Sequence, residues 1–91
     1  MLSWDDVLAL KSDIVTRETD GELVVVMPEQ GKFVVLNVTG ARVLQLADGK
    51  RSLREIAALI ADEFSVDALR VKEDALAFAN SLMDRQVLYT V

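Results

Sequence analysis

The chain has 91 residues, 52% hydrophobic and 27% charged, which fits one small folded domain and excludes wholesale disorder. It contains no Cys and no His, which excludes disulfides, thiolate nucleophiles and sulfur-ligated metals and removes the commonest general base. The net charge of -5 disfavours nucleic acids and anionic membranes as partners, because both select basic patches.

The N-terminal segment is the part that the sequence determines least. Its opening, MLSWDDVLAL, carries acids where a secretory signal would carry positive charge, and its apolar run is too short. Either Ser3 caps a single helical turn with Val7 and Leu8 facing inward, or residues 1–12 form a mobile tail. No stretch approaches the roughly 20 apolar residues of a membrane span, so we expect a cytoplasmic protein.

Three strands are predicted next. The first, Ile14 to Glu18, leads into Asp20-Gly21, which marks a hairpin because both central residues of a tight turn need positive φ. The second, Glu22 to Met27, is rich in Val, and Pro28-Glu29-Gln30-Gly31 supplies the following turn. The third is Lys32 to Leu36. Short turns between neighbours predict an antiparallel meander.

Three helices are predicted to follow the strands. The first covers Thr39 to Ala47 and ends at Asp48-Gly49, where glycine can adopt the left-handed conformation. The second begins at Ser52, which fits a capping box with Glu55. Its apolar stripe comprises Leu53, Ile56, Ala57, Ile60 and Phe64.

The third helix is capped by Asp67 and runs to about Arg85, and Val87 to Val91 forms a terminal strand or packs on the core. The predicted fold is therefore α+β and winged-helix-like, with a three-stranded antiparallel sheet followed by three helices. We assign residues 1–91 to a single domain, because no composition break or repeat interrupts them.

Motifs for catalysis or metal binding are missing from the sequence. The four glycines are too widely spaced for a phosphate loop, and neighbouring acids on a helix point about 100° apart. We therefore expect no enzymatic activity, no metal and no cofactor. The basic residues Arg42, Lys50, Arg51 and Arg54 either hold a ligand phosphate or, as we favour, are solvated charges that partly face Glu55 or Asp48.

The third strand, KFVVL, is apolar at nearly every position, whereas a strand that merely covers a core alternates. If Val34 and Leu36 face the helices, Phe33 and Val35 face outward. Two interpretations remain: the terminal VLYTV segment buries the outward side, or Phe33 and Val35 line a ligand groove.

The third helix has a second apolar flank beside its core stripe. Val71, Ala75, Phe78 and Leu82 form the core stripe, and the flank consists of Lys72, Leu76, Ala79 and Met83. Either two neighbouring elements cover both, or the flank is the wall of a groove. An extended peptide in such a groove would add a strand to the sheet edge. The candidate peptide-binding residues are Lys32, Phe33, Val34, Val35, Leu36, Lys72, Leu76, Ala79 and Met83.

An ordered set of short motifs resembles the PqqD family over about residues 13 to 89. These motifs are Leu36-Asn37-Val38-Thr39-Gly40-Ala41, Leu46-Ala47-Asp48-Gly49-Lys50-Arg51-Ser52, Glu55-Ile56, Val71-x-x-Asp74 and Phe78-x-x-x-Leu82. The resemblance implies a non-catalytic recognition element for ribosomally made, post-translationally modified peptides. In such elements a precursor's leader peptide pairs with the third strand and lies against the third helix.

Two departures from the family pattern bear on the partner enzyme. Val43-Leu44 stands where the family often has an aromatic residue, and Arg85-Gln86-Val87 where it often has Gly. The first departure weakens the resemblance to the family's PQQ members. The short free-standing chain looks more like the stand-alone recognition proteins of lasso-peptide pathways, which implies a leader peptidase as partner. A pathway to pyrroloquinoline quinone (PQQ) would instead imply a radical SAM enzyme.

Other functional classes stay open at this point. A winged-helix DNA-binding regulator needs a basic recognition helix, but Arg54 is opposed by Glu55, Asp62 and Glu63. A homodimer through the exposed strand is a second alternative, and we expect a monomer or a weak dimer. A small hydrolase is the most distant, because no two acids are placed to face one cleft.

Overall fold

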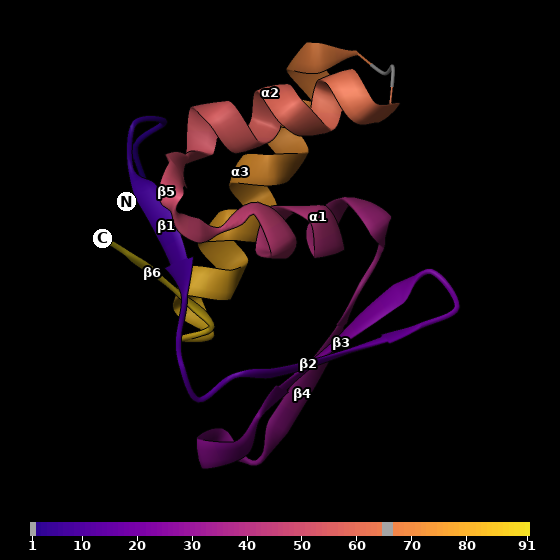
Figure 1. The fold of residues 1–91 in the computed structure, drawn as a ribbon, viewed down its shortest axis with the longest axis vertical. Coiled ribbons are helices and arrows are strands. Elements are labelled where there is room, and N and C mark those ends of the chain that lie inside the picture. The colour runs from indigo at the N-terminus through magenta and orange to yellow at the C-terminus, as the bar shows by residue number, and fades with distance from the viewer. Residues whose placement is uncertain (1, 65–66) are drawn as a thin grey trace.

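The computed structural model describes residues 2–64 and 67–91, which form three helices and two three-stranded antiparallel sheets (Figure 1). The predicted α+β class is confirmed. The predicted winged helix accounts for the helices and for one sheet, and the other sheet was not foreseen.

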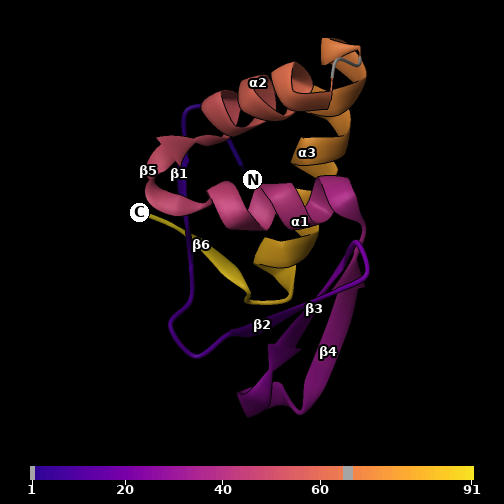
Figure 2. The ribbon, with the colours of Figure 1, turned by 45° about the vertical axis from the view of Figure 1, so that its right-hand side comes forward.

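The foreseen sheet has the order β2-β3-β4 and projects from the helices at the bottom of Figures 1 and 2. Its strands are β2 (Val15–Thr19), β3 (Glu22–Met27) and β4 (Lys32–Leu36). Asp20 and Gly21 have φ values of 34° and 84°, so the predicted hairpin turn is confirmed. A 3-10 turn, η1 (Pro28–Gln30), connects β3 to β4.

The second and third helices begin at the predicted caps, whereas the first begins one residue before the predicted Thr39, at a cap that was not predicted from the sequence. Asn37 precedes α1 (Val38–Leu46), and its side-chain oxygen accepts a hydrogen bond from the Gly40 amide at 3.0 Å. α2 (Leu53–Phe64) follows the predicted capping box, in which Ser52 and Glu55 each accept the other's backbone N–H. α3 (Ala68–Asp84) follows Asp67, whose carboxylate accepts from the Leu69 amide. None of the helices within the described ranges is long and apolar enough to cross a bilayer.

The second sheet has the order β5-β1-β6 and corrects the prediction for the N-terminus. Ser3 does cap a turn, because its Oγ accepts the Asp5 N–H and its backbone oxygen accepts the Asp6 N–H. The residues after this turn are not a mobile tail but the central strand, β1 (Val7–Leu10). Leu8 is fully buried, and β1 pairs on one side with β5 (Asp48–Ser52) and on the other with β6 (Leu88–Thr90). The two strands that pair with β1 lie about 40 and 80 residues further along the chain, so no local sequence pattern indicates the pairing.

The N-terminal segment also satisfies the start of α2. The backbone oxygens of Trp4 and Asp6 accept the N–H groups of Arg54 and Leu53, each at 2.9 Å. The first amides of a helix lack partners inside the helix, so these two bonds fix the segment in place.

One hydrophobic core joins both sheets to the helices. It includes Leu8 and Leu88 from one sheet, Val25 and Met27 from the other, and Ile56 from α2, all at most 1% exposed. In Figures 1 and 2 the β5-β1-β6 sheet lies at the left of the helices and the β2-β3-β4 sheet below them. The core therefore positions both α3 and β4, the two elements that the sequence had singled out.

Candidate functional site

Strand β4 lies at one edge of its sheet. It pairs with β3 from Leu23↔Leu36 to Met27↔Lys32, and no other strand of the described residues pairs with its second edge. The backbone N–H and C=O groups that point away from β3 are therefore open to another chain.

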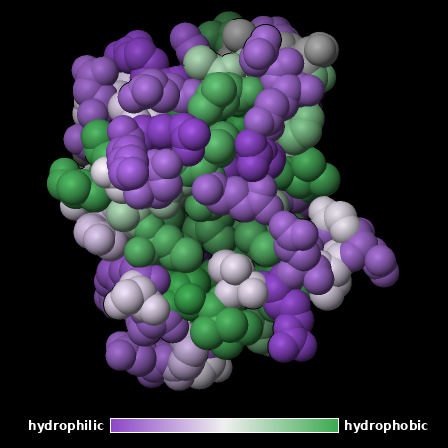
Figure 3. All heavy atoms as spheres, viewed as in Figure 1, coloured by the Kyte–Doolittle hydropathy of each residue, from purple (hydrophilic) through white to green (hydrophobic). Residues whose placement is uncertain are grey.

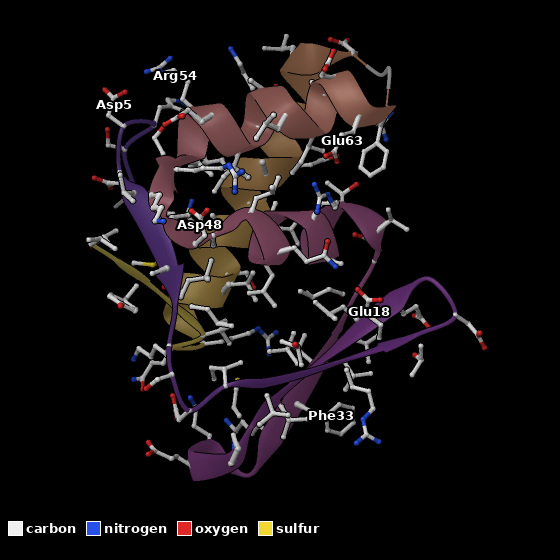
Figure 4. The ribbon with its side chains drawn as sticks, in the orientation of Figure 1. Asp5, Glu18, Phe33, Asp48, Arg54 and Glu63 are labelled. Carbon is white, nitrogen blue, oxygen red and sulfur yellow. The ribbon has the colours of Figure 1, made fainter. Side chains whose placement is uncertain are left out.

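The two faces of β4 differ in their surroundings, as predicted. Leu36 is buried, 5% exposed, and Val34 is half-buried against the core. Phe33 and Val35 face the other way and are 69% and 45% exposed, and Figure 4 shows Phe33 on the sheet below the helices. Lys32 is exposed at the start of the strand. A foreign strand at this edge would have apolar neighbours on both faces.

The C-terminal segment does not cover β4. Its strand β6 pairs with β1 in the other sheet, from Leu8↔Thr90 to Leu10↔Leu88. This pairing excludes the interpretation in which VLYTV buries the outward side of β4.

Segments next to both ends of β4 approach helix α3 or the residue that follows it. At the C-terminal end of β4, a Cβ atom added to Gly40 would lie 3.0 Å from Cε1 of Phe78 and 3.3 Å from Cβ of Leu36, so the three residues converge. At the other end, Nε2 of Gln30 donates to the backbone oxygen of Arg85 at 2.9 Å. The side of α3 nearest β4 is therefore the one that carries Phe78.

The flank predicted from the sequence faces elsewhere. At 100° per residue, Lys72, Leu76, Ala79 and Met83 lie about 100° to 160° around the helix from Phe78. Ala79 is fully buried, Leu76 and Met83 pack on the core, and Lys72 is half-buried. Met83 lines a hollow with Leu2 and Thr90, beside the β5-β1-β6 sheet. The flank therefore points away from the Phe78 side of α3, and its role in binding stays a prediction.

A cavity of about 560 Å³ lies near the C-terminal end of β4 and was not foreseen. It is lined by Val38, Thr39, Phe64, Asp67, Arg70, Val71 and Asp74. Val38 follows β4 after a single residue and is 51% exposed, and Phe64, which the sequence placed in a core stripe, is 37% exposed. The signal in the sequence that could have indicated this cavity is an apolar residue at each of two helix ends, Val38 at the start of α1 and Phe64 at the end of α2.

The apolar surface continues on the face seen in Figure 3, where hydrophobic side chains gather between α1 and the β2-β3-β4 sheet. A hollow there is lined by Leu10, Leu23, Leu44 and Ala47, with Glu18 and Gln45 joined across it by a 2.9 Å hydrogen bond. That bond links β2 to α1 and holds the sheet against the helix.

The basic cluster consists largely of ion pairs. Arg42 donates to both carboxylate oxygens of Glu63 and so joins α1 to α2, and Arg51 pairs with Asp48 at 2.9 Å, as predicted. The hydrogen bonds from Arg42 lower the pKa of Glu63, and the Lys50 amide followed by that of Arg51 lowers the pKa of Asp48. Arg54 forms an ion pair with Asp5 at 3.3 Å and not with Glu55, which the sequence had suggested as a partner of the basic cluster. Figure 4 shows Asp5, Asp48 and Glu63 at separate places on the molecule rather than gathered in one.

A metal centre is not indicated within residues 2–64 and 67–91. No three carboxylates there lie close enough to hold one ion, and the sequence has no Cys or His. The arrangement can bind an extended chain through the backbone of β4 and offers apolar contacts beside it.

Comparison with known proteins identifies the family of the chain. The family model described as coenzyme PQQ synthesis protein D (PqqD) matches residues 22–88. A PqqA binding protein of Gluconobacter oxydans is 37% identical over 59 residues, which span 65% of this chain and 62% of that protein. The chain thus matches less than two thirds of that relative's length.

Three solved structures share the fold. TbiB1 in complex with the TbiA(β) leader peptide is 26% identical, with a TM-score of 0.76 over 88% of this chain and 93% of that one. A lasso peptide synthetase B1 complexed with a leader peptide is 23% identical, with a TM-score of 0.77 over 91% and 98%. The PqqD part of Methylobacterium extorquens PqqCD is 24% identical, with a TM-score of 0.81 over 98% and 95%. Since the family model covers most of the chain and the fold agrees throughout, the protein belongs to the PqqD family.

Proposed function

We propose that the protein is a non-catalytic adaptor that binds the leader of a ribosomally made precursor peptide and delivers it to a modifying enzyme. The observation that carries this proposal is the open edge of β4 beside the Phe78 side of α3. An edge strand flanked by a helix is the geometry that β-strand addition uses.

The backbone of β4 would set the register of the bound leader. Alternate leader side chains would lie beside Phe33 and Val35 on one face of the sheet and beside Val34 on the other. One end of the leader would reach the cavity lined by Val38 and Phe64. Because these surroundings are apolar and the chain is acidic overall, we expect apolar leader residues to contribute more than charged ones.

The adaptor would act by tethering. The chain offers no Cys or His for covalent or general-base chemistry. A leader held on β4 would keep the adjoining core peptide near an enzyme that binds the same complex, at an effective concentration of up to about millimolar for a short linker.

Two kinds of partner enzyme are supported by different observations. The structural likeness to TbiB1 and to a lasso peptide synthetase B1, both solved with leader peptides, supports a lasso pathway with a leader peptidase. The likeness to a PqqA binding protein supports a PQQ pathway with a radical SAM enzyme. A titration with the TbiA(β) leader, with PqqA and with the precursor encoded beside this chain's gene would choose between them.

The proposed edge is tested by a matched pair of variants. Val35→Asp places a charge on the outer face of β4, whereas Val15→Asp places the same charge on the same face at the opposite edge of the sheet. We expect the first to weaken leader binding at least about tenfold and the second to leave it within about twofold. Equal affinity of both folded variants would remove β4 from the site.

Two charge reversals on α3 test which side of this helix lies beside the bound leader. Asp74 lies about 40° from Phe78 and lines the cavity, whereas Lys72 lies about 120° away on the flank that the sequence predicted. We expect Asp74→Lys to change leader affinity and Lys72→Glu to leave it unchanged. The reverse result would restore the flank of Lys72, Leu76, Ala79 and Met83 as the wall.

A DNA-binding role would give a different result. A duplex shifted at physiological salt, with an affinity that falls steeply as salt rises, together with no binding of any leader, would replace the adaptor by a winged-helix regulator.

A further inference from the structure

β4 differs from the other edge strands in lacking features that prevent pairing with another chain. The edge strand β2 carries Arg17 and Glu18, β5 contains Asp48, Lys50 and Arg51, and β6 has only three residues. Charges and short length are the usual protection of an exposed edge. β4 has a single charge, Lys32, at its first position, and its remaining four residues are apolar.

The sequence of β4 is complementary to itself when two copies run antiparallel. In the register that uses all five residues, Val34 lies opposite its own copy, Phe33 opposite Val35, and Lys32 opposite Leu36. An aromatic residue then faces a β-branched one across the strands, which is a favourable pair. The two Lys32 side chains lie about 13 Å apart along the strands, so they do not oppose the pairing directly.

The same register also continues the apolar outer face. Val15, Val26 and Phe33 form one cross-strand row, and Val24 lies beside Val35 in the next. Pairing of two copies would join Phe33 of one row to Val35 of the other copy, producing a six-stranded sheet whose four central strands share an apolar outer face, with Arg17 beyond it on β2.

We propose that β4, when it carries no leader, pairs antiparallel with β4 of a second copy, with Val34 at the two-fold axis. The edge that binds the leader is then held in a dimer, and the leader competes with the second copy for the same backbone groups. Only this competition rests on the proposed function; the pairing itself does not.

The dimer has a predicted dependence on salt. Each chain carries a net charge of -5, so two copies repel each other over the range of the Debye length, about 10 Å at 0.1 M salt. Raising the salt concentration should therefore strengthen the dimer. A contact held by ion pairs would weaken instead.

Cross-linking through an introduced cysteine tests the register, because the chain has no cysteine of its own. Directly opposed residues of antiparallel strands have Cα atoms about 4.5 to 5.5 Å apart, within the range of a disulfide. Under mild oxidation we expect Val34→Cys to form a disulfide dimer at least about tenfold faster than Val15→Cys, which sits on the opposite edge of the same sheet.

Sedimentation of the unmodified chain over a wide concentration range completes the test. We expect a reversible dimer that Phe33→Lys weakens at least about tenfold and that salt strengthens. A chain that stays monomeric, or equal cross-linking of the two cysteine variants, would overturn the inference.

Binding of a leader is measured separately, so the two failures differ. A monomer that binds the TbiA(β) leader or PqqA through β4 keeps the adaptor function and loses the dimer. A dimer cross-linked through position 34 that binds no leader keeps the pairing and loses the adaptor. If the leader binds and the cross-linking rate does not fall, the competition is wrong.

Discussion

At the scale of single residues, Gly40 determines how closely α1 approaches α3. A methyl group at this position would lie 3.0 Å from Cε1 and 3.1 Å from Cδ1 of the Phe78 ring. Two effects then oppose each other. Alanine favours a helix over glycine by about 1 kcal/mol, and overpacking costs typically about 1–3 kcal/mol. We expect Gly40→Ala to lower the free energy of unfolding, because overpacking is the larger effect.

Whether the Phe78 ring causes this loss of stability is tested by making Gly40→Ala in a Phe78→Leu variant as well. With Phe78→Leu the ring is gone, so Gly40→Ala should cost at least about 1 kcal/mol less than it does in the parent chain. Urea unfolding of the four proteins measures this coupling. An equal cost in both backgrounds would show that Phe78 is not what limits the approach of α1.

The Arg42–Glu63 pair predicts a dependence of stability on pH. The hydrogen bonds from Arg42 hold the pKa of Glu63 below its ordinary value of 4.5 in the folded chain. A carboxyl group with a lowered folded pKa contributes stability that is present above its unfolded pKa and is lost as pH falls through the folded one. Glu63→Gln should therefore destabilise the protein at neutral pH and make no difference at strongly acidic pH.

Asp62 supplies the matched control for this experiment. It carries the same charge one residue earlier and forms no ion pair among the residues that the structure describes. The difference in the free energy of unfolding between Glu63→Gln and Asp62→Asn, followed by urea unfolding across pH, should vanish in acid. A difference that persists there would mean that packing of the Glu63 side chain, and not its charge, stabilises the α1–α2 contact.

At the scale of elements, β1 should be essential to stability. Leu8 is fully buried and belongs to the core, whereas Leu10, two residues later on the same strand, is only half-buried. Leu8→Ala should cost about 2–5 kcal/mol, and Leu10→Ala clearly less. Thermal or urea unfolding distinguishes the two variants. Little loss from Leu8→Ala would return the N-terminus to the role of a dispensable tail.

The elements that the sequence predicted correctly carry local signals. Asp20-Gly21 marks its own turn, and Ser52 with Glu55 marks the start of α2 within four residues. β1 and β5 were missed because their pairing is remote: Ala9 lies opposite Asp48, and the polar DGKRS segment has no strand-like pattern. Such a segment becomes a strand only because β1 lies beside it.

In the candidate site, too, the part set by a local pattern could be predicted and the part set by tertiary packing could not. The outward face of Phe33 and Val35 follows from the two-residue period of a strand once Leu36 is assigned to the core. The wall of α3 could not be assigned, because a helical wheel shows two apolar flanks and not which neighbour each one meets. The approach of Phe78 and Leu36 to Gly40 favours the Phe78 side, and this approach depends on the packing of three separate elements.

At the scale of the whole molecule, a single core joins the two sheets. Leu8 and Leu88 from the β5-β1-β6 sheet belong to the same cluster as Val25 and Leu36 from the β2-β3-β4 sheet. Neither sheet can lose its packing without exposing the residues that support the other. We therefore expect one cooperative unfolding transition.

Leader binding at β4 should consequently stabilise the distant sheet as much as the near one. A ligand present at 100 times its dissociation constant raises the free energy of unfolding by about 2.7 kcal/mol when it binds only the folded state. In hydrogen exchange, the slowest amides of β1, which exchange by global unfolding, should gain the same protection as those of β3. Protection confined to β3 and β4 would show that the two sheets open independently, and the adaptor would then consist of a movable binding sheet on a separate support.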